Sequence, residues 1–220
     1  MKALSREQVA RRVARDVPDG AYVNLGIGLP TLVGNFVPSD REVIYHSENG
    51  ILGMGPAPAK GEEDLDLINA SKQYVTLLPG TAIVQHTDAF VMIRGGHIDL
   101  ALLGAFQVSA DGDLANWSTG EGGSPPGVGG AMDLAAGAAA VWVLMEHTTK
   151  RGEPRIVRRC TYPLTAQRVV KRIYTNMAVI DVTPDGLVVR EIAPGFDFAT
   201  LQKHTDADLT LANDWRAMEI

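Results

Sequence analysis

A single glutamate stands out in this sequence because of the residues on either side of it. Glu48 lies in the string His-Ser-Glu-Asn-Gly at positions 46–50. Residues 42–45 are typical of a short buried strand, and Asn-Gly is a strong turn signal because both residues accept a positive φ. The spacing therefore predicts a carboxylate at the end of a strand, beside a tight turn, where it can meet a substrate. On spacing alone, a hairpin turn with a solvated surface glutamate explains the same residues.

A second candidate is the stretch from Gly120 to Gly130, the most glycine-dense part of the chain. It leads directly into residues 131–136, which have the character of a helix start. A glycine loop at the N-terminus of a helix presents backbone N–H groups that can bind an anion or the oxyanion of a reaction intermediate. A flexible linker is the alternative reading, but apolar residues resume at once and no domain boundary follows.

Other patterns with known chemistry are incomplete. Gly26-Ile27-Gly28 follows a predicted strand, as in dinucleotide-binding loops, but the sixth position of G-x-G-x-x-G is Thr31. We interpret this loop as a tight turn that brings the backbone close to another segment. Cys160 is the only cysteine, so the chain has no internal disulfide and no cysteine cluster for a metal. We therefore predict no metal site.

Composition narrows the class of protein. The chain has 220 residues, of which 45% are hydrophobic and 21% charged, as expected of a globular protein. Its net charge of −6 argues against nucleic acid or an anionic membrane as the main partner. No apolar run reaches the roughly 18 residues that a membrane span needs, and the N-terminus lacks a signal-peptide core. We expect a cytoplasmic protein.

The elements that must position these residues alternate along the chain. A capping box formed by Ser5 and Gln8 predicts the start of a helix that ends near Val17. The patterns predict further helices from Pro30 and over 87–94, 131–136, 166–174 and 198–204, strands at 21–25, 42–45, 74–78, 97–104 and 140–147, and a β-hairpin over 177–192. The tail after Thr210 is expected to be loosely held. This alternation predicts one α/β domain over residues 1–220, with a mixed, largely parallel sheet.

The sequence also resembles a known family. Ser-Glu-Asn-Gly at 47–50, followed by Leu-Gly-Met-Gly-Pro at 52–56, resembles the active-site segment of the beta (B) subunit of family I, 3-oxoacid-type CoA-transferases. The resemblance spans about residues 14–205 and implies a three-layer α/β fold. It implies that Glu48 is the covalent nucleophile and that Gly129 or Gly130 supplies a backbone N–H to the oxyanion hole. It also implies that substrate is bound around Ser47, Asn49, Gly50, Gly127 and Gly28.

A CoA-transferase moves CoA from an acyl thioester to a free carboxylate. The resemblance implies that Glu48 attacks the acyl-CoA carbonyl and that the CoA thiolate then converts the mixed anhydride into a Glu48–CoA thioester. A free glutamate has a pKa of about 4.3, so it is ionised at neutral pH without a neighbouring base. The CoA thioester is a substrate, and no metal, nicotinamide or flavin cofactor is expected. The resemblance further implies a different partner chain, the alpha (A) subunit, in an A2B2 heterotetramer.

The identity of the acceptor acid depends on fewer residues. His46 and the loop over 53–66 are most similar to members of the family that move CoA from succinyl-CoA to 3-oxoadipate in aromatic degradation. Transfer from succinyl-CoA or acetyl-CoA to acetoacetate is the alternative. His46 or Lys60 is a candidate for contacting a distal carboxylate, although a solvated position at the rim explains either residue as well.

Two functions from other classes also fit the fold. In a non-catalytic ligand sensor, Glu48 would be dispensable. A phosphosugar isomerase, which shares this fold, needs a phosphate-binding lysine on its glycine loops, and neither 26–28 nor 127–130 carries one.

Overall fold

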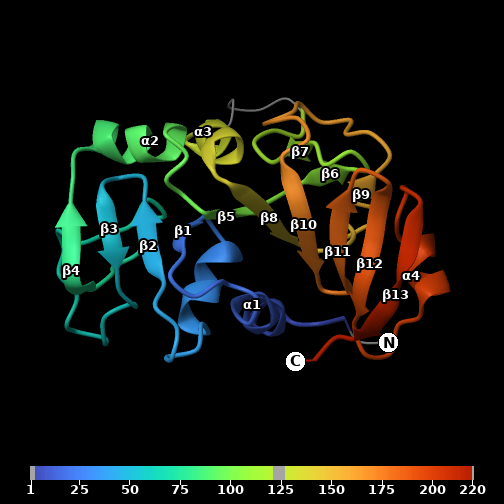
Figure 1. The fold of residues 1–220 in the computed structure, drawn as a ribbon, viewed down its shortest axis with the longest axis horizontal. Coiled ribbons are helices and arrows are strands. Elements are labelled where there is room, and N and C mark those ends of the chain that lie inside the picture. Colours follow the sequence, from blue (N-terminus) through green and yellow to red (C-terminus); the bar gives the residue numbers. More distant parts are fainter. Residues whose placement is uncertain (1–2, 121–126, 220) are drawn as a thin grey trace.

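A ten-stranded mixed sheet crosses the whole molecule (Figure 1). The computed structural model describes residues 3–120 and 127–219. Five adjacent strands at the centre of the sheet are parallel: β10 (Val170–Thr175), β8 (Ala140–Met145), β5 (Leu100–Gly104), β1 (Tyr22–Leu25) and β2 (Ile44–Ser47). Their carboxyl ends therefore lie along one edge of the sheet. The predicted class, an α/β fold with a mixed and largely parallel sheet, is confirmed.

Antiparallel strands extend the sheet on both sides of this parallel centre. Next to β2, the chain turns back into β3 (Ile51–Met54), which pairs with the edge strand β4 (Leu77–Ile83). Next to β10, the predicted hairpin is confirmed as β11 (Ala178–Thr183) and β12 (Gly186–Ile192). Strand β13 (Leu209–Ala217) pairs in parallel with β12 and forms the other edge.

Helices cover both faces of the sheet. Helices α2 (His86–Arg94) and α3 (Ala131–Gly137) pack on one face through Ile93 and Leu134, and α1 (Arg6–Ala14) and the 3₁₀ helix η1 (Pro30–Asn35) pack on the other. In β8, Val143 faces the first of these cores and Leu144 the second, which explains its unbroken apolar run. Between residues 3 and 219, the described helices all lack the length and apolar character needed to cross a bilayer.

A smaller sheet and a short helix complete the fold. Strands β7 (Leu114–Ala115), β6 (Gln107–Ser109) and β9 (Ile156–Val157) form a three-stranded sheet in that order. Helix α4 (Phe198–Lys203) begins at Asp197, whose side chain accepts a hydrogen bond from the Thr200 N–H. This helix was predicted at 198–204, and the prediction is confirmed.

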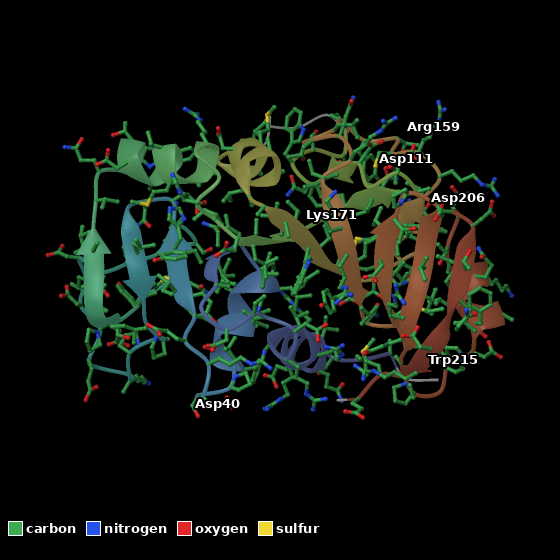
Figure 2. The ribbon with its side chains drawn as sticks, in the orientation of Figure 1. Asp40, Asp111, Arg159, Lys171, Asp206 and Trp215 are labelled. Atoms are coloured by element: carbon green, nitrogen blue, oxygen red, sulfur yellow. The ribbon has the colours of Figure 1, made fainter. Side chains whose placement is uncertain are left out.

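The predicted helix over residues 166–174 is wrong. Arg168 has a φ of +56°, which a helix does not allow, and the following residues form β10. The basic residues suggested the exposed face of a helix, and Lys171 is indeed exposed (Figure 2). However, Val170 and Ile173 are buried between β8 and β11, and this sheet environment decides the conformation.

Two other expectations about strands need correction. The tail after Thr210 is not loosely held, because β13 runs to Ala217 along β12 and leaves Trp215 exposed at the edge of the sheet (Figure 2). The strand expected at 74–78 instead begins at Leu77, and β4 continues through Pro79 and Gly80 to Ile83, with a register shift opposite them in β3. Proline is tolerated there because β4 is an edge strand.

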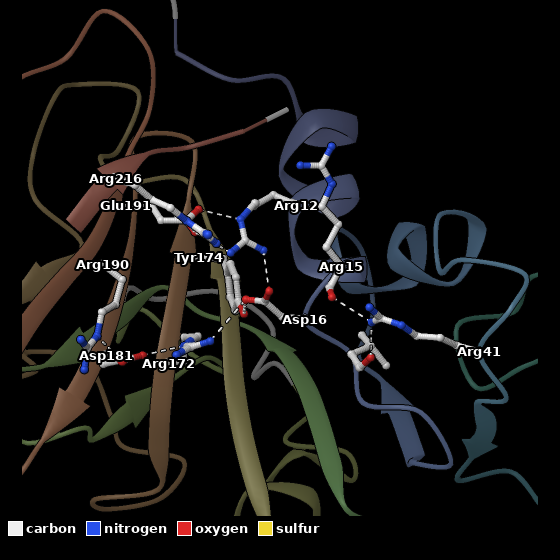
Figure 3. A network of polar contacts seen from close by, with 11 residues as sticks. Arg12, Arg15, Asp16, Arg41, Arg172, Tyr174, Asp181, Arg190, Glu191 and Arg216 are labelled. Carbon is white, nitrogen blue, oxygen red and sulfur yellow. Dashed lines mark hydrogen bonds and ion pairs between the residues drawn. The ribbon is translucent and has the colours of Figure 1, made fainter. Parts of the chain in front are cut away.

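A network of charged side chains fixes α1 to the sheet (Figure 3). Arg12 Nε lies 2.6 Å from Glu191 Oε2, and Arg12 Nη1 lies 2.8 Å from Asp16 Oδ1. The Tyr174 hydroxyl donates to Asp16 Oδ2 at 2.6 Å, and Arg216 Nη2 lies 2.8 Å from Glu191 Oε1. Arg12 and Glu191 are both buried. The predicted capping box is also present at the start of this helix, with Ser5 and Gln8 bonded to each other's backbone N–H.

A fully buried histidine follows β8. His147 Nδ1 lies 3.0 Å from Thr175 Oγ1, and Nε2 lies 2.9 Å from Thr205 Oγ1. Burial, together with a smaller effect of His204, lowers the pKa of His147 from 6.5 to about 4. In the unfolded chain, the His147 ring therefore takes up a proton as the pH falls through about 6.5. In the folded chain it does so only near pH 4. Because the unfolded state binds more protons in this window, the stability that the neutral His147 provides is lost as the pH falls through it.

We expect the free energy of unfolding to fall by about 2 kcal/mol between pH 7 and pH 5 on account of His147. Urea unfolding of the wild type and of His147→Gln at several pH values measures this. The variant loses stability at pH 7 because its hydrogen bonds change, but its stability depends less steeply on pH. An equally steep dependence in the variant would assign the effect to other groups. The carboxylates of Asp16 and Glu191, whose pKa values are lowered, titrate below this range.

Candidate active site

Glu48 directly follows the last residue of β2, in the turn that joins β2 to β3. The Gly50 N–H donates to the Ser47 carbonyl at 2.9 Å and closes this turn. Gly50 has a φ of +115°, and a Cβ atom there would collide with the Val84 carbonyl oxygen, so only glycine fits. Asn49 Nδ2 donates to the Ile68 carbonyl at 2.7 Å. The predicted turn and the position of the carboxylate at the end of a strand are confirmed, and the strand itself, expected at 42–45, lies at Ile44–Ser47.

A cavity of about 970 Å³ opens beside Glu48. It lies at the carboxyl ends of β1, β2, β5 and β8, where ligands bind in sheets of this kind. Its walls include Gly26, Glu48, Gly104 and Glu146, which directly follow or end these strands. Phe90 and Leu134 bring α2 and α3 to the same cavity. The fold therefore places the predicted carboxylate in the wall of this cavity.

Asn24 holds the carboxylate of Glu48. Its Nδ2 donates to Glu48 Oε2 at 3.2 Å and lies 3.1 Å from His46 Nδ1. Asn24 is fully buried on β1, beside His46 on β2. The amide therefore connects the carboxylate to the centre of the sheet, so that Glu48 has a fixed orientation.

His46 and His86 support the same residue in different ways. Burial lowers the pKa of His46, although the charge of Glu48 raises it in part. The ring is therefore neutral at pH 7, and its Nδ1 lies within hydrogen-bond distance of Asn24 Nδ2. His86 Nδ1 donates to the main-chain carbonyl of Glu48 at 2.9 Å. His46 is buried and Lys60 is exposed, and neither lines the cavity.

The glycines before α3 reach the cavity as expected. Gly127, Gly129 and Gly130 all line it. Gly130 precedes α3, and a Cβ atom on it would lie 3.7 Å from Glu48 Cγ and 3.1 Å from the Phe90 ring. The backbone of this loop is therefore a direct neighbour of Glu48. The part of the glycine-dense stretch at 121–126 lies outside the described residues.

Three other predicted residues shape the site from outside the cavity wall. Ser47 Oγ accepts a hydrogen bond from the Ala70 N–H at 3.0 Å, and Gly50 makes the turn. Gly28, with a φ of +92°, lies between Ile27 and Leu29, which line the cavity. Gly26 donates its N–H to the Leu102 carbonyl at 2.8 Å, which is the close backbone approach that the glycine loop predicted.

Sequence reasoning missed Asn24, His86 and Arg155, of which the first two hold Glu48 and the last two line the cavity. A polar residue inside an otherwise apolar strand was a signal for Asn24. His86 and Arg155 gave no signal, because they come from segments distant in sequence. Across residues 3–120 and 127–219, there is no cluster of three or more His, Cys, Asp or Glu side chains arranged to hold a metal ion.

Comparisons with known proteins show which family this chain is similar to. The chain matches the family described as Coenzyme A transferase over residues 6–203. It is 63% identical to the beta (B) subunit of 3-oxoadipate CoA-transferase from Pseudomonas putida, over 92% of this chain and 94% of that protein. It is 44% identical to the B subunit of a probable succinyl-CoA:3-ketoacid coenzyme A transferase from Bacillus subtilis, over 94% of this chain and 96% of that protein.

A solved structure shows the same fold. The crystal structure of an acyl-CoA transferase (YdiF) from Escherichia coli O157:H7 superposes with a TM-score of 0.77 and 21% identity, covering all of this chain and 44% of that longer chain. The family match, together with a glutamate in a cavity at the ends of parallel strands, defines a transferase. The chain belongs to the coenzyme A transferase family, and the resemblance found in its sequence is confirmed.

Proposed function

We propose that this chain is the beta subunit of an enzyme that moves CoA from succinyl-CoA to a 3-oxo acid, with 3-oxoadipate as the favoured acceptor. The observation that supports it most directly is the Glu48 carboxylate, held by Asn24 at 3.2 Å beside a cavity of about 970 Å³. The 63% identity to a 3-oxoadipate CoA-transferase chain of the same type supports the choice of acceptor.

The proposed reaction proceeds by a ping-pong mechanism through Glu48. A Glu48 oxygen attacks the carbonyl carbon of succinyl-CoA, and the CoA thiolate leaves to give a mixed anhydride. The thiolate then attacks the Glu48 Cδ, which releases succinate and leaves a Glu48–CoA thioester. The 3-oxo acid attacks this thioester, and the same steps in reverse give the new acyl-CoA and free Glu48. Each proposed step exchanges one acyl bond for another and needs no oxidant or reductant.

The chain supplies two further contributions in this proposal. Asn24 donates to Glu48 Oε2 and so points the other oxygen toward the substrate. Each tetrahedral intermediate carries negative charge on one oxygen, and a backbone N–H of Gly129 or Gly130 is proposed to stabilise it. Removing one such donor typically raises the barrier by about 3–4 kcal/mol. The Phe90 ring beside Gly130 helps exclude water, which would hydrolyse the anhydride.

The proposal includes a second, different chain. The Pseudomonas and Bacillus relatives are each named as the B subunit of their enzyme, which supports a partner of another type. We propose an A2B2 heterotetramer in which the alpha subunit completes the CoA-binding surface. Activity is therefore expected from the copurified complex and little from this chain alone.

The intact mass of this chain, copurified with its alpha partner and incubated with succinyl-CoA, tests the proposal. A mass increase equal to CoA less one water, lost on borohydride reduction and absent from Glu48→Ala, would support the thioester. Glu42→Gln is a matched control, because Glu42 is an exposed glutamate before the other end of β2. Absence of the adduct from the assembled wild type would contradict the mechanism and favour a ligand sensor. Discharge of the adduct by 3-oxoadipate or by acetoacetate identifies the acceptor.

We expect Asn24→Ala to lower kcat by about 10- to 100-fold with a smaller change in KM. The variant removes the hydrogen bond that orients Glu48, and a small misplacement of a reacting group has effects of this size. Rapid-quench measurement of adduct formation in the complex gives the rate directly. The control is Asn69→Ala, which removes a buried and hydrogen-bonded asparagine that does not line the cavity. An equal loss in both variants would indicate a general structural effect.

A further inference from the structure

Five ionisable side chains line the large cavity, namely Arg6, Glu48, His86, Glu146 and Arg155. Only Glu48 and Arg155 among them are half-buried, and the other three are exposed. Within the described part of the chain, no carboxylate lies within 4.0 Å of the Arg155 guanidinium. A guanidinium stays charged at any physiological pH, and its partial removal from water costs free energy unless an anion compensates. The cavity wall therefore carries a positive charge that can accept an anion.

The fold holds Arg155 firmly on one wall. Its N–H donates to the His147 carbonyl at 3.1 Å, and its carbonyl accepts from the Val108 N–H at 3.0 Å. His147 continues β8, whereas Glu48 follows β2, and the sheet order β8-β5-β1-β2 puts three strand spacings between them. At about 4.8 Å per spacing, the two backbones are about 14 Å apart across the sheet. Arg155 therefore lies on the side of the cavity away from Glu48.

We propose that Arg155 binds the distal carboxylate of a dicarboxylic acid whose other carboxylate reacts at Glu48. This inference rests on the proposed function and extends it to the choice of acid. The planar guanidinium can hold a carboxylate through two parallel hydrogen bonds. A short diacid between the Glu48 and Arg155 side chains spans the cavity. Acetoacetate ends in a methyl group and offers nothing to Arg155, so Arg155 selects dicarboxylic acids.

The phosphates of CoA are the other anions in this reaction. A contact between Arg155 and a phosphate would affect every CoA thioester alike, whatever acid is transferred. Arg6 is the other arginine on the cavity wall, but it is exposed on the first turn of α1. A contact with the distal carboxylate would instead affect dicarboxylic acids alone. The two contacts can therefore be distinguished by comparing different acids.

Discharge of the Glu48–CoA thioester by different acids is the first test. The complex is loaded to completion with succinyl-CoA, freed of excess by gel filtration and mixed with 3-oxoadipate or acetoacetate. We expect Arg155→Gln to lower the ratio of the rate constants for 3-oxoadipate and acetoacetate by about 10- to 100-fold. Arg155→Lys keeps the charge but cannot form the two parallel hydrogen bonds of a guanidinium. Its ratio of rate constants is expected to lie between those of the wild type and Arg155→Gln.

Arg159→Gln is the matched control for these variants. Arg159 is four residues further along, is exposed at the surface (Figure 2) and does not line the cavity. An unchanged ratio in Arg155→Gln would overturn the inference. A second result would also overturn it, namely a higher KM for both succinyl-CoA and acetoacetyl-CoA with an unchanged ratio of discharge rate constants. That result would assign Arg155 to the phosphates of CoA.

Binding of adipate separates this inference from the proposed mechanism. Adipate is a diacid of the same length without the keto group, and calorimetry with the Glu48→Ala complex needs no covalent step. Adding Arg155→Gln is expected to weaken adipate binding by about 10- to 100-fold, and equal affinity would overturn the inference. If the wild type forms no thioester but adipate binding still depends on Arg155, the mechanism fails and the carboxylate site stands.

Discussion

Replacing Glu48 by glutamine is expected to lower kcat of the assembled enzyme by at least about 10⁴-fold, the scale seen when a covalent nucleophile is removed. An amide has nearly the shape of a carboxylate, and its oxygen can still accept the hydrogen bond from Asn24 Nδ2. The amide oxygen is a poor nucleophile at any pH, so neither the anhydride nor the thioester can form. The measurement is the steady-state rate of 3-oxoadipyl-CoA formation from succinyl-CoA.

The design of this experiment separates chemistry from folding. Glu48→Gln should unfold within about 2 °C of the wild type, because the half-buried side chain keeps its size and its neighbours. Glu42→Gln, at the other end of β2, is expected to retain wild-type activity. Substantial transfer activity in purified Glu48→Gln, above what contaminating wild type could supply, would exclude Glu48 as the nucleophile.

The second large effect concerns stability. Glu191→Ala is expected to lower the free energy of unfolding by about 3–5 kcal/mol, because it leaves Arg12 buried without its main partner. Arg12 and Glu191 are 5% and 3% exposed. Arg12 Nε donates to Glu191 Oε2 at 2.6 Å, and Arg12 Nη2 donates to Glu191 Oε1 at 2.7 Å. Burial alone would raise the pKa of Glu191, but its hydrogen bonds to Arg12 and Arg216 lower it. For a chain of this length, the expected loss lowers the thermal midpoint by about 6–20 °C.

Glu219→Ala provides the comparison for this variant. Glu219 lies 3.6 Å from Arg15, and both side chains of this pair are exposed. Exposed pairs of this kind contribute about 0–1 kcal/mol, so the midpoint should hardly move. The double variant Arg12→Met/Glu191→Leu removes both buried charges and should recover most of the stability. A double variant as unstable as Glu191→Ala would show that Asp16 and Arg216 also depend on the pair.

The sequence predicted the elements that local rules determine. The Ser5 capping box, the Asn49-Gly50 turn and the hairpin over 177–192 each depend on neighbours in the chain, and all are confirmed. The helix expected at 166–174 failed because the pattern around Lys171 suits a helix surface as well as a strand. Only the neighbouring strands β8 and β11 decide between them. β13 was missed for a similar reason, since its outer half is exposed and finds its partner only in β12.

The residues of the candidate site also fall into two groups, those that local sequence predicts and those that depend on the fold. Glu48 and the glycines at 127–130 are predictable because a turn and a helix start are local features. Asn24 lies on β1 and Arg155 lies just before β9, so the places of both residues at the site depend on how distant segments are arranged in the fold. His46 was a candidate for contacting a distal carboxylate or for a solvated position at the rim, but it is buried, because alternation along β2 turns its ring toward Asn24.

The charged network around α1 also has a consequence for synthesis of the chain. Helix α1 is made well before Tyr174, Glu191 and Arg216, which anchor Arg12 and Asp16. Until β10, β12 and β13 have been made, Arg12 and Asp16 therefore lack these partners, although η1 can already cover part of the apolar face of α1, with Val9 and Val13. Contacts between such distant segments form slowly. We expect nascent chains that end before β10 to bind general chaperones through α1, and release to follow once β10 to β13 have emerged.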